Sequence, residues 1–297
     1  MSFSVDQINH LYNFRSHYLN RNGYRYHYLD EGEGEPVVML HGNPSWSFMY
    51  RELVRSLGDS YRRVVPDHMG CGLSDKPSSQ EYAYTLQQRV ADLEALLDQI
   101  GVDSNITLIM HDWGGAIGMT YAVRHPSRIG RLIVLNTAAF LLPPGKALHW
   151  SLSLCRNSRV AAFLILRLNA FARIAAYMGC RPPMPKEIRR AYWSPYDSWQ
   201  NRIATLRFVQ DIPLTSADPS YAPLQETQEN LYRFQETPML ICWGEKDFIF
   251  DGDFLREWIR RFPKAQVHRF PEAGHYLLEE LPQAIGILVR DFLARHP

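Results

Sequence analysis

Eight consecutive residues in the first half of the chain constrain its fold more than any others. They read Leu108-Ile109-Met110-His111-Asp112-Trp113-Gly114-Gly115. An apolar run, a short polar segment and two glycines predict a buried strand, a sharp turn at Asp112 and a helix that packs closely on the strand. The alternative is an ordinary strand that leads into a helix with Asp112 as its N-cap. Gly114 and Gly115 favour the sharp turn.

Strand and helix patterns alternate on both sides of this turn. An Asn-Gly pair at Asn22 and Gly23 predicts a hairpin between the first two strands. Such alternation is typical of a doubly wound α/β fold, and it predicts a mostly parallel, eight-stranded sheet with helices on both faces. The predicted strands are 12–19, 24–29, 37–40, 63–67, 108–111, 132–135, 239–243 and 266–270, and the predicted helices are 47–57, 85–100, 113–124, 253–261 and a last one from Pro282.

The alternation stops between Ala138 and Tyr221. Pro143-Pro144-Gly145 breaks the chain there, helical segments follow, and no strand pattern returns until Met239. We therefore predict an α/β core (1–137 and 222–297) with an inserted helical cap (138–221). The cap holds 11 Lys and Arg against 4 Asp and Glu, whereas the core holds 21 against 27. A basic cap thus lies on an acidic core.

Within the cap, residues Val160 to Met178 are almost all apolar. At 100° per residue, Arg156, Arg159, Arg167 and Arg173 fall within about one third of the helix circumference, which makes the stretch amphipathic. We expect its apolar side to be buried against the core or in a homo-oligomer formed through the cap. Docking on a membrane surface is the alternative.

Composition narrows the possible partners and the compartment. The net charge of +1 and the absence of a Lys/Arg tract give no reason to expect nucleic-acid binding. Residues 1–14 lack the cationic start and apolar core of a signal peptide, and the four cysteines have no metal-like spacing. We expect reduced thiols, a cytoplasmic location, no metal and no cofactor.

Three residues at the ends of predicted strands form a candidate catalytic triad. A carboxylate at the turn, Asp112, can displace a leaving group from a saturated carbon and form an alkyl ester that water later cleaves. His275 would activate that water, and Asp247 would orient the imidazole and stabilise its cationic form. The rival acids are Glu245, Asp251 and Glu272.

The segment His41-Gly42-Asn43-Pro44 supplies a second set of groups at the same edge of the sheet. The backbone N–H groups of Asn43 and Trp113 would form an oxyanion hole for the hydrolysis of the ester. Their side chains are neutral N–H donors, suited to a departing halide or another anion. The alternative is that Trp113 only lines a pocket and Asn43 only caps a turn.

These segments resemble the haloalkane dehalogenases, which are α/β-hydrolases with a nucleophile elbow. The resemblance rests on Asp112-Trp113-Gly114, the loop around Asn43, the segment from Trp243 to Asp247, and Gly274-His275. It implies the subfamily with aspartate as both nucleophile and acid and with an Asn/Trp halide pair. The sequence departs from the family at Met110, where glycine is common. The expected substrate is a small halogenated alkane, and the products are an alcohol and a halide ion.

Other functions remain open. Residues 135–140, Arg190-Ala191-Tyr192 and 210–214 resemble the β-lactone decarboxylases of bacterial long-chain olefin synthesis, close relatives of that subfamily, so lactone decarboxylation is the main alternative. Epoxide hydrolases share the Asp-Trp pair and use cap tyrosines, for which Tyr177, Tyr192 and Tyr196 are available. A non-catalytic ligand receptor is the alternative of another class, and the complete triad argues against it.

Overall fold

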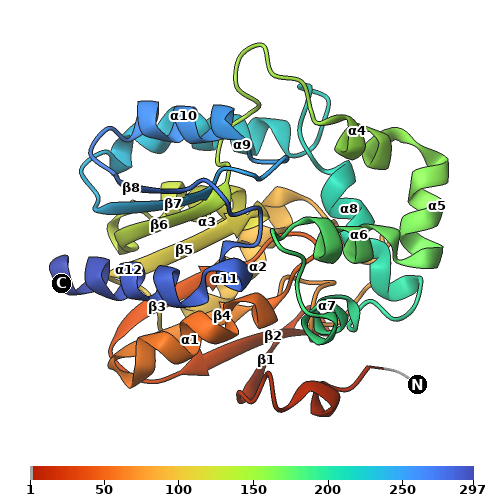
Figure 1. Cartoon of the computed structure of the whole chain (residues 1–297), viewed down its shortest axis with the longest axis horizontal. Coiled ribbons are helices and arrows are strands. Elements are labelled where there is room, and N and C mark those ends of the chain that lie inside the picture. The colour runs from red at the N-terminus through yellow and green to blue at the C-terminus, as the bar shows by residue number, and fades with distance from the viewer. Residues whose placement is uncertain (1–2) are drawn as a thin grey trace.

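The computed structural model describes residues 3–297, and one eight-stranded sheet forms its centre (Figure 1). The strand order is β1-β2-β4-β3-β5-β6-β7-β8. Strands β1 and β2 pair antiparallel, as do β2 and β4, and all other neighbours are parallel. The predicted mostly parallel sheet is confirmed. Its strands are β1 (Ser16–Arg21), β2 (Tyr24–Glu31), β3 (Glu35–Leu40), β4 (Tyr61–Pro66), β5 (Ile106–Asp112), β6 (Ile129–Thr137), β7 (Met239–Gly244) and β8 (Gln266–Phe270).

Helices cover both faces of the sheet because its strands are apolar on both sides. Val38 and Leu40 of β3 point to one face and Val37 and Met39 to the other, and all four are fully buried. One face packs against α2 (Leu86–Gln99), α3 (Trp113–Arg124), α9 (Tyr221–Asn230) and α10 (Gly252–Arg261). The other face packs against α1 (Arg51–Leu57), α11 (Leu277–Glu280) and α12 (Pro282–Arg295).

The N-terminal hairpin forms as predicted, but its first strand begins later. Asn22 and Gly23 both have positive φ, 52° and 89°, as a tight hairpin turn requires. Strand β1 starts at Ser16, not at Tyr12, because the Tyr12 ring packs 5.0 Å from that of Trp46 and its hydroxyl lies 2.6 Å from the Ser47 hydroxyl. These tertiary contacts hold Tyr12 away from the sheet.

The segment between β6 and α9 is helical and lies over the carboxyl ends of the parallel strands (Figure 1). Helix α9 begins at the predicted end of the cap and packs against α3 of the sheet layer. The division into a core (1–137 and 222–297) and a cap (138–221) remains a prediction. The cap helices are α4 (Trp150–Asn157), α5 (Arg159–Leu168), α6 (Ala170–Met178), α7 (Lys186–Trp193) and α8 (Ile203–Gln210).

The amphipathic stretch of the cap differs from the expectation in two ways. Asn169, with φ 55°, separates α5 from α6, and the two helices meet at an angle of 82°, so the arginines do not share one helical face. The stretch also buries only one side, which carries Ala161, Ile165, Ala172 and Ala176. Val160 and Phe163 stay 69% and 58% exposed. Burial against the core is therefore not seen for the larger side chains of the stretch, and their burial in another subunit stays a prediction.

Candidate active site

Asp112 lies at the sharp turn between β5 and α3. Its φ of 52° and ψ of −125° lie outside the regions that non-glycine residues favour, so neighbouring groups must hold the turn. Glycines make room for it: a Cβ at Gly42 would lie 1.9 Å from Oδ1 of Asp112, and one at Gly114 would lie 2.0 Å from the carbonyl oxygen of Leu40. The predicted strand, turn and helix are confirmed.

Met110 stands two positions before Asp112, where glycine is common in the family that the sequence resembles, and Gly118 on α3 makes room for its side chain. The Met110 side chain is fully buried between the sheet and α3. A Cβ at Gly118 would approach its sulfur to 2.6 Å, closer than atoms can pack. The larger side chain therefore fits because the opposing helix position is glycine.

The carboxylate of Asp112 is held by backbone amides. The Asn43 N–H donates to its Oδ1 over 2.6 Å, and the Trp113 N–H also bonds to the carboxylate. Burial raises the pKa of Asp112, and this effect outweighs the opposing influence of His275 and of the two amides. The two amides that we predict as an oxyanion hole therefore contact the Asp112 carboxylate, Asn43 through Oδ1, while Oδ2 faces His275.

His275 lies between the two predicted carboxylates. Its Nδ1 is 2.7 Å from Oδ2 of Asp247, and its Nε2 is 3.8 Å from Oδ2 of Asp112. Burial would lower the pKa of His275, but the neighbouring carboxylates, Asp247 first, outweigh it and raise the pKa above 6.5. Burial likewise opposes ionisation of Asp247, yet His275 and the Ile249 and Phe250 amides keep the pKa of Asp247 below its usual value.

The three rival acids are engaged elsewhere. Glu245 pairs with Arg269 at 3.6 Å, and Glu272, 86% exposed, pairs with Lys246. Asp251 caps α10 through the Asp253 amide and pairs with Lys146 at 2.5 Å. None of them contacts His275. The structure brings together Asp112, Asp247 and His275, from the ends of three different strands.

Asn136 also supports this cluster, and the sequence analysis missed that role. Its Nδ2 donates to Oδ2 of Asp247 and to the Gly244 carbonyl oxygen, both over 3.0 Å, and its Oδ1 accepts from the Gly244 amide. Asn136 is fully buried at the carboxyl end of β6, beside β7. A polar residue ending a buried strand next to the strand of the acid was the available signal.

The side chains of Asn43 and Trp113 face the cavity, but Asn43 has a second partner. Its Nδ2 donates to the Thr205 carbonyl oxygen in α8 over 3.0 Å. One of its two N–H groups therefore joins the core to the cap, and the other remains for a ligand. Trp113 packs on the Phe208 ring at 5.5 Å and lines the same cavity.

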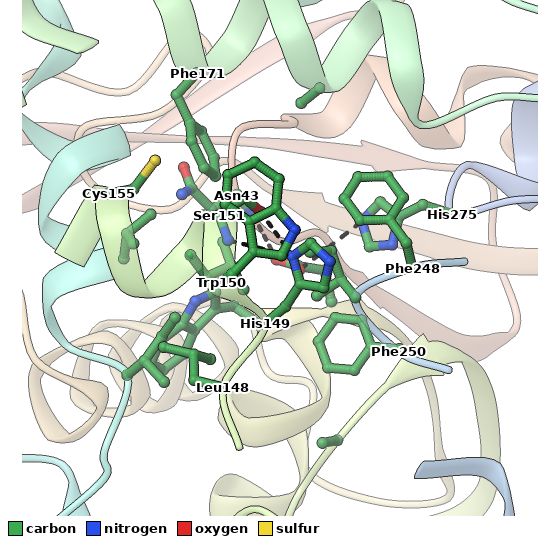
Figure 2. Close-up of a pocket in the computed structure, with 18 of the residues that line it drawn as sticks. Asn43, Leu148, His149, Trp150, Ser151, Cys155, Phe171, Phe248, Phe250 and His275 are labelled. Atoms are coloured by element: carbon green, nitrogen blue, oxygen red, sulfur yellow. Dashed lines mark hydrogen bonds and ion pairs between the residues drawn. The ribbon is translucent and has the colours of Figure 1, made fainter. Parts of the chain in front are cut away.

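The cavity above Asp112 has a volume of about 580 Å³ and is mostly apolar. Asn43, Asp112, Trp113 and His275 form its floor, and α4, α5 and α6 form its outer wall. In Figure 2, aromatic rings from the start of α4 and from the loop after β7 surround Asn43 and His275. These rings belong to His149, Trp150, Phe248 and Phe250, and Phe250 stacks on His275 at 5.9 Å.

The cap tyrosines do not reach this cavity. The Tyr192 hydroxyl bonds to Glu279 over 2.7 Å, and the Tyr196 hydroxyl donates to the Ser45 carbonyl oxygen over 3.0 Å. Tyr177 is 56% exposed on the outside of α6. The epoxide hydrolase alternative, which depends on cap tyrosines, therefore has no support from their positions.

Known proteins resemble the chain over nearly its whole length. Residues 35–282 match the family model described as alpha/beta hydrolase fold. The chain is 53% identical over 281 residues to a cis-3-alkyl-4-alkyloxetan-2-one decarboxylase of Shewanella oneidensis, covering 94% of this chain and 88% of that protein. It is 30% identical over 294 residues to Haloalkane dehalogenase 2 of Mycobacterium bovis, covering 97% and 98%.

A solved structure has the same fold. The chain aligns with a haloalkane dehalogenase from Agrobacterium tumefaciens with a TM-score of 0.84 and 23% identity, covering 95% of this chain and 97% of the other. At this identity, the likeness establishes the shared fold. The chain belongs to the alpha/beta hydrolase fold family, together with the haloalkane dehalogenases and the cis-3-alkyl-4-alkyloxetan-2-one decarboxylases, and like them it is an enzyme.

Proposed function

We propose that this enzyme converts cis-3-alkyl-4-alkyloxetan-2-ones, which are β-lactones with two alkyl substituents, into cis-alkenes and carbon dioxide. The supporting observation is the 53% identity to a decarboxylase of that name, against 30% to a named dehalogenase. The sequence motifs alone placed dehalogenation first and decarboxylation second. The relatives reverse that order.

Asp112 would act as the nucleophile. Its Oδ2 attacks the saturated ring carbon C4 and forms an ester bond, while the bond between C4 and the ring oxygen breaks and frees a carboxylate. The bond between that carboxylate and C3 then breaks and carbon dioxide leaves. The electron pair forms the double bond between C3 and C4, and the Asp112 ester bond breaks. These steps consume neither water nor a cofactor.

The other residues would stabilise the charges that move. The side-chain N–H groups of Asn43 and Trp113 would bind the freed carboxylate, and the backbone amides at Oδ1 would stabilise Asp112 as it departs. Protonated His275, oriented by Asp247, would add a positive charge beside Asp112. The largely apolar cavity of about 580 Å³ suits two alkyl chains.

Dehalogenation is the second candidate, favoured by the pairing of Asn43 and Trp113 at the cavity floor. Asp112 would displace the halide, Asn43 and Trp113 would bind it, and His275 would activate water to cleave the ester. Nε2 of His275 lies 3.8 Å from Oδ2 of Asp112, which is too far for a direct hydrogen bond. Nε2 is therefore free to accept a proton from water, which supports this step.

One experiment separates the candidates. The purified enzyme is given cis- and trans-β-lactones and brominated alkanes of matched chain length, and alkene, carbon dioxide and bromide are measured. We expect cis-alkene from the cis-lactone at a rate far above that of bromide release. Faster bromide release, with no alkene, would reject decarboxylation as the main activity. Asp112→Ala is the control, and it should be inactive with all substrates.

Three further expectations belong to this proposal. The substrate is small and apolar, the enzyme works in the cytoplasm with its four thiols free, and a halide ion can occupy the place of the freed carboxylate. A homo-oligomer formed through the cap also remains a prediction. The outer surface of the cap gives reason to consider a different partner.

A further inference from the structure

The outer surface of the cap carries an unusual concentration of exposed apolar side chains. Nine of the thirteen large apolar residues exposed in the described chain lie within residues 150–178. Helix α5, which carries four of them, lies at the outer edge of the molecule (Figure 1). We call this set the apolar cap face: Trp150, Leu154, Val160, Phe163, Leu164, Leu168, Ile174, Tyr177 and Met178. Apolar surface gathered in this way marks an interaction site.

The charged residues in the segment that carries the apolar cap face are all basic, and of these Arg156 is paired with Asp218 from the loop after α8. Residues 147–186 contain six Lys or Arg and no Asp or Glu. Arg159, Arg167 and Arg173 are exposed on α5 and α6, the two helices that carry seven of the nine apolar side chains. A partner that binds this surface must therefore be apolar and must also bring negative charge.

A second copy of the chain does not meet that requirement. In a two-fold dimer the same patch meets itself, so the cationic side chains of one copy would face those of the other. The surface of a bilayer with anionic lipids does meet it, because acyl chains accept apolar side chains and the headgroups bind arginine. The cytoplasmic leaflet carries such lipids.

The apolar cap face also continues into the cavity. Trp150, Leu154 and Leu164 are exposed and also line the cavity, as do Ile174 and Met178. An apolar path therefore leads from the surface between α4, α5 and α6 to Asp112. A substrate dissolved in lipid could follow this path without crossing water, a consequence that rests on the proposed function.

The helices suit a position on the bilayer surface. Among residues 3–297, no single helix is both long and apolar enough to cross a membrane, and α5 with α6 meets the criterion only as a pair bent by 82°. We propose that the apolar cap face docks on the surface of a bilayer that contains anionic lipids, and that the cavity opens toward the acyl chains.

Vesicle binding tests the proposal with the full chain. The protein is mixed with vesicles of phosphatidylcholine alone, or of phosphatidylcholine and phosphatidylglycerol in equal parts, and bound protein is measured by flotation. We expect binding to the anionic vesicles, much weaker binding to the neutral ones, and a decrease as salt is added. No binding to either vesicle would overturn the proposal.

Variants locate the docking surface. Phe163→Ser with Leu168→Ser removes apolar area outside the cavity lining, and Arg159→Glu with Arg167→Glu reverses charge. Each pair should lower binding at least about fivefold, because loss of one charge near an anionic surface has about this effect and loss of a buried Phe or Leu side chain costs at least as much. Ile287→Ser with Arg295→Glu is the matched control on α12, far from α5 in Figure 1, and it should bind as the wild type does.

Two readouts separate lipid docking from other outcomes. Thermal melting checks that each variant folds, and activity on a short-chain substrate in water should stay unchanged in all of them, since none of these residues lines the cavity. Light scattering without lipid detects self-association. A dimer that the cap variants abolish, together with no vesicle binding, would assign the apolar cap face to a second copy and reject the lipid.

Discussion

Nε2 of His275 lies 3.8 Å from Oδ2 of Asp112, while Oδ1 of the same carboxylate accepts the Asn43 amide over 2.6 Å. The two oxygens of Asp112 are therefore unequal. Oδ1 is held by the Asn43 amide, and Oδ2 has no hydrogen-bond partner on the His275 side, so we propose that Oδ2 is the oxygen that attacks a substrate. The two oxygens would therefore act in different chemical steps.

The first prediction concerns the leaving anion. Trp113→Phe removes one preorganised N–H donor, so bromide release from a brominated alkane should slow by about 10²-fold. Asn43→Ala should have an effect of the same order and should also loosen the cap, because Thr205 loses its partner. Trp193→Phe, a cap tryptophan outside the cavity, is the control. If Trp113→Phe releases bromide at the wild-type rate, Trp113 does not bind the leaving anion.

The second prediction concerns Asn136 as a positioning residue. Asn136→Ala leaves the Gly244 amide without its partner in a buried place, which should lower the free energy of unfolding by about 1–3 kcal/mol. It should also lower kcat, because Asp247 loses a donor at 3.0 Å. Urea unfolding and steady-state kinetics measure the two effects.

Asn201→Ala is the matched control for Asn136→Ala. Asn201 donates to Asp197 over 2.7 Å at the surface, so its loss should change stability by less than about 0.5 kcal/mol. A loss of stability as small as that of the control would contradict the structural role of Asn136 at Gly244, and an unchanged kcat would show that its contact with Asp247 does not contribute to activity.

The sequence predicted the Asp112 turn, the triad order and the strands because each depends on local pattern and chain order. It did not single out Asn136, because a polar residue at the end of a buried strand does not name its partner: Asp247 is 111 residues away and meets Asn136 only where β6 pairs with β7. It also could not reveal the bend at Asn169, because one left-handed residue changes the direction of a helix without changing its hydrophobic pattern.

The third prediction concerns pH. Water activation in dehalogenation needs neutral His275, and Asp247 is the main group that raises the pKa of His275. Hydrolysis of the ester should therefore slow as the pH falls through the pKa of His275 in the intermediate, where esterified Asp112 carries no charge and no longer adds to the rise. In Asp247→Asn the pKa of His275 should fall, because burial lowers it and the main opposing carboxylate is gone. The decrease in rate should then occur at lower pH, and the maximal rate should also fall. A decrease at the same pH as in the wild type would show that another group controls it.

The fourth prediction concerns chain length. Ala161 is buried on α5 and lines the cavity wall, so Ala161→Phe should shorten the space for alkyl chains. We expect kcat/KM to fall at least about tenfold for long-chain lactones, since even one methylene that no longer fits costs this much, and to change little for short ones. Ala162→Phe, the next residue and outside the cavity lining, is the control. Equal losses of kcat/KM in both variants would show that the alkyl chains of the substrate do not lie beside Ala161.

The last prediction separates the two proposed chemistries at Asp112. His275→Ala should still form the ester with a brominated alkane, because displacement needs no proton transfer, but it should not hydrolyse it. About one equivalent of bromide should appear in a burst, and the protein mass should rise by the alkyl group on the peptide that contains Asp112. Asp112→Ala should show neither effect.

With a cis-β-lactone the same His275→Ala variant should still turn over, although more slowly, because decarboxylation needs no activated water. In heavy-oxygen water the wild type should place label in the Asp112 carboxylate during dehalogenation and not during decarboxylation, since only the first route cleaves the ester by hydrolysis. If no substrate that the wild type consumes gives an adduct, and label never enters Asp112, then Asp112 is not the nucleophile. Label in Asp112 during alkene formation would instead require a hydrolytic step in the lactone route.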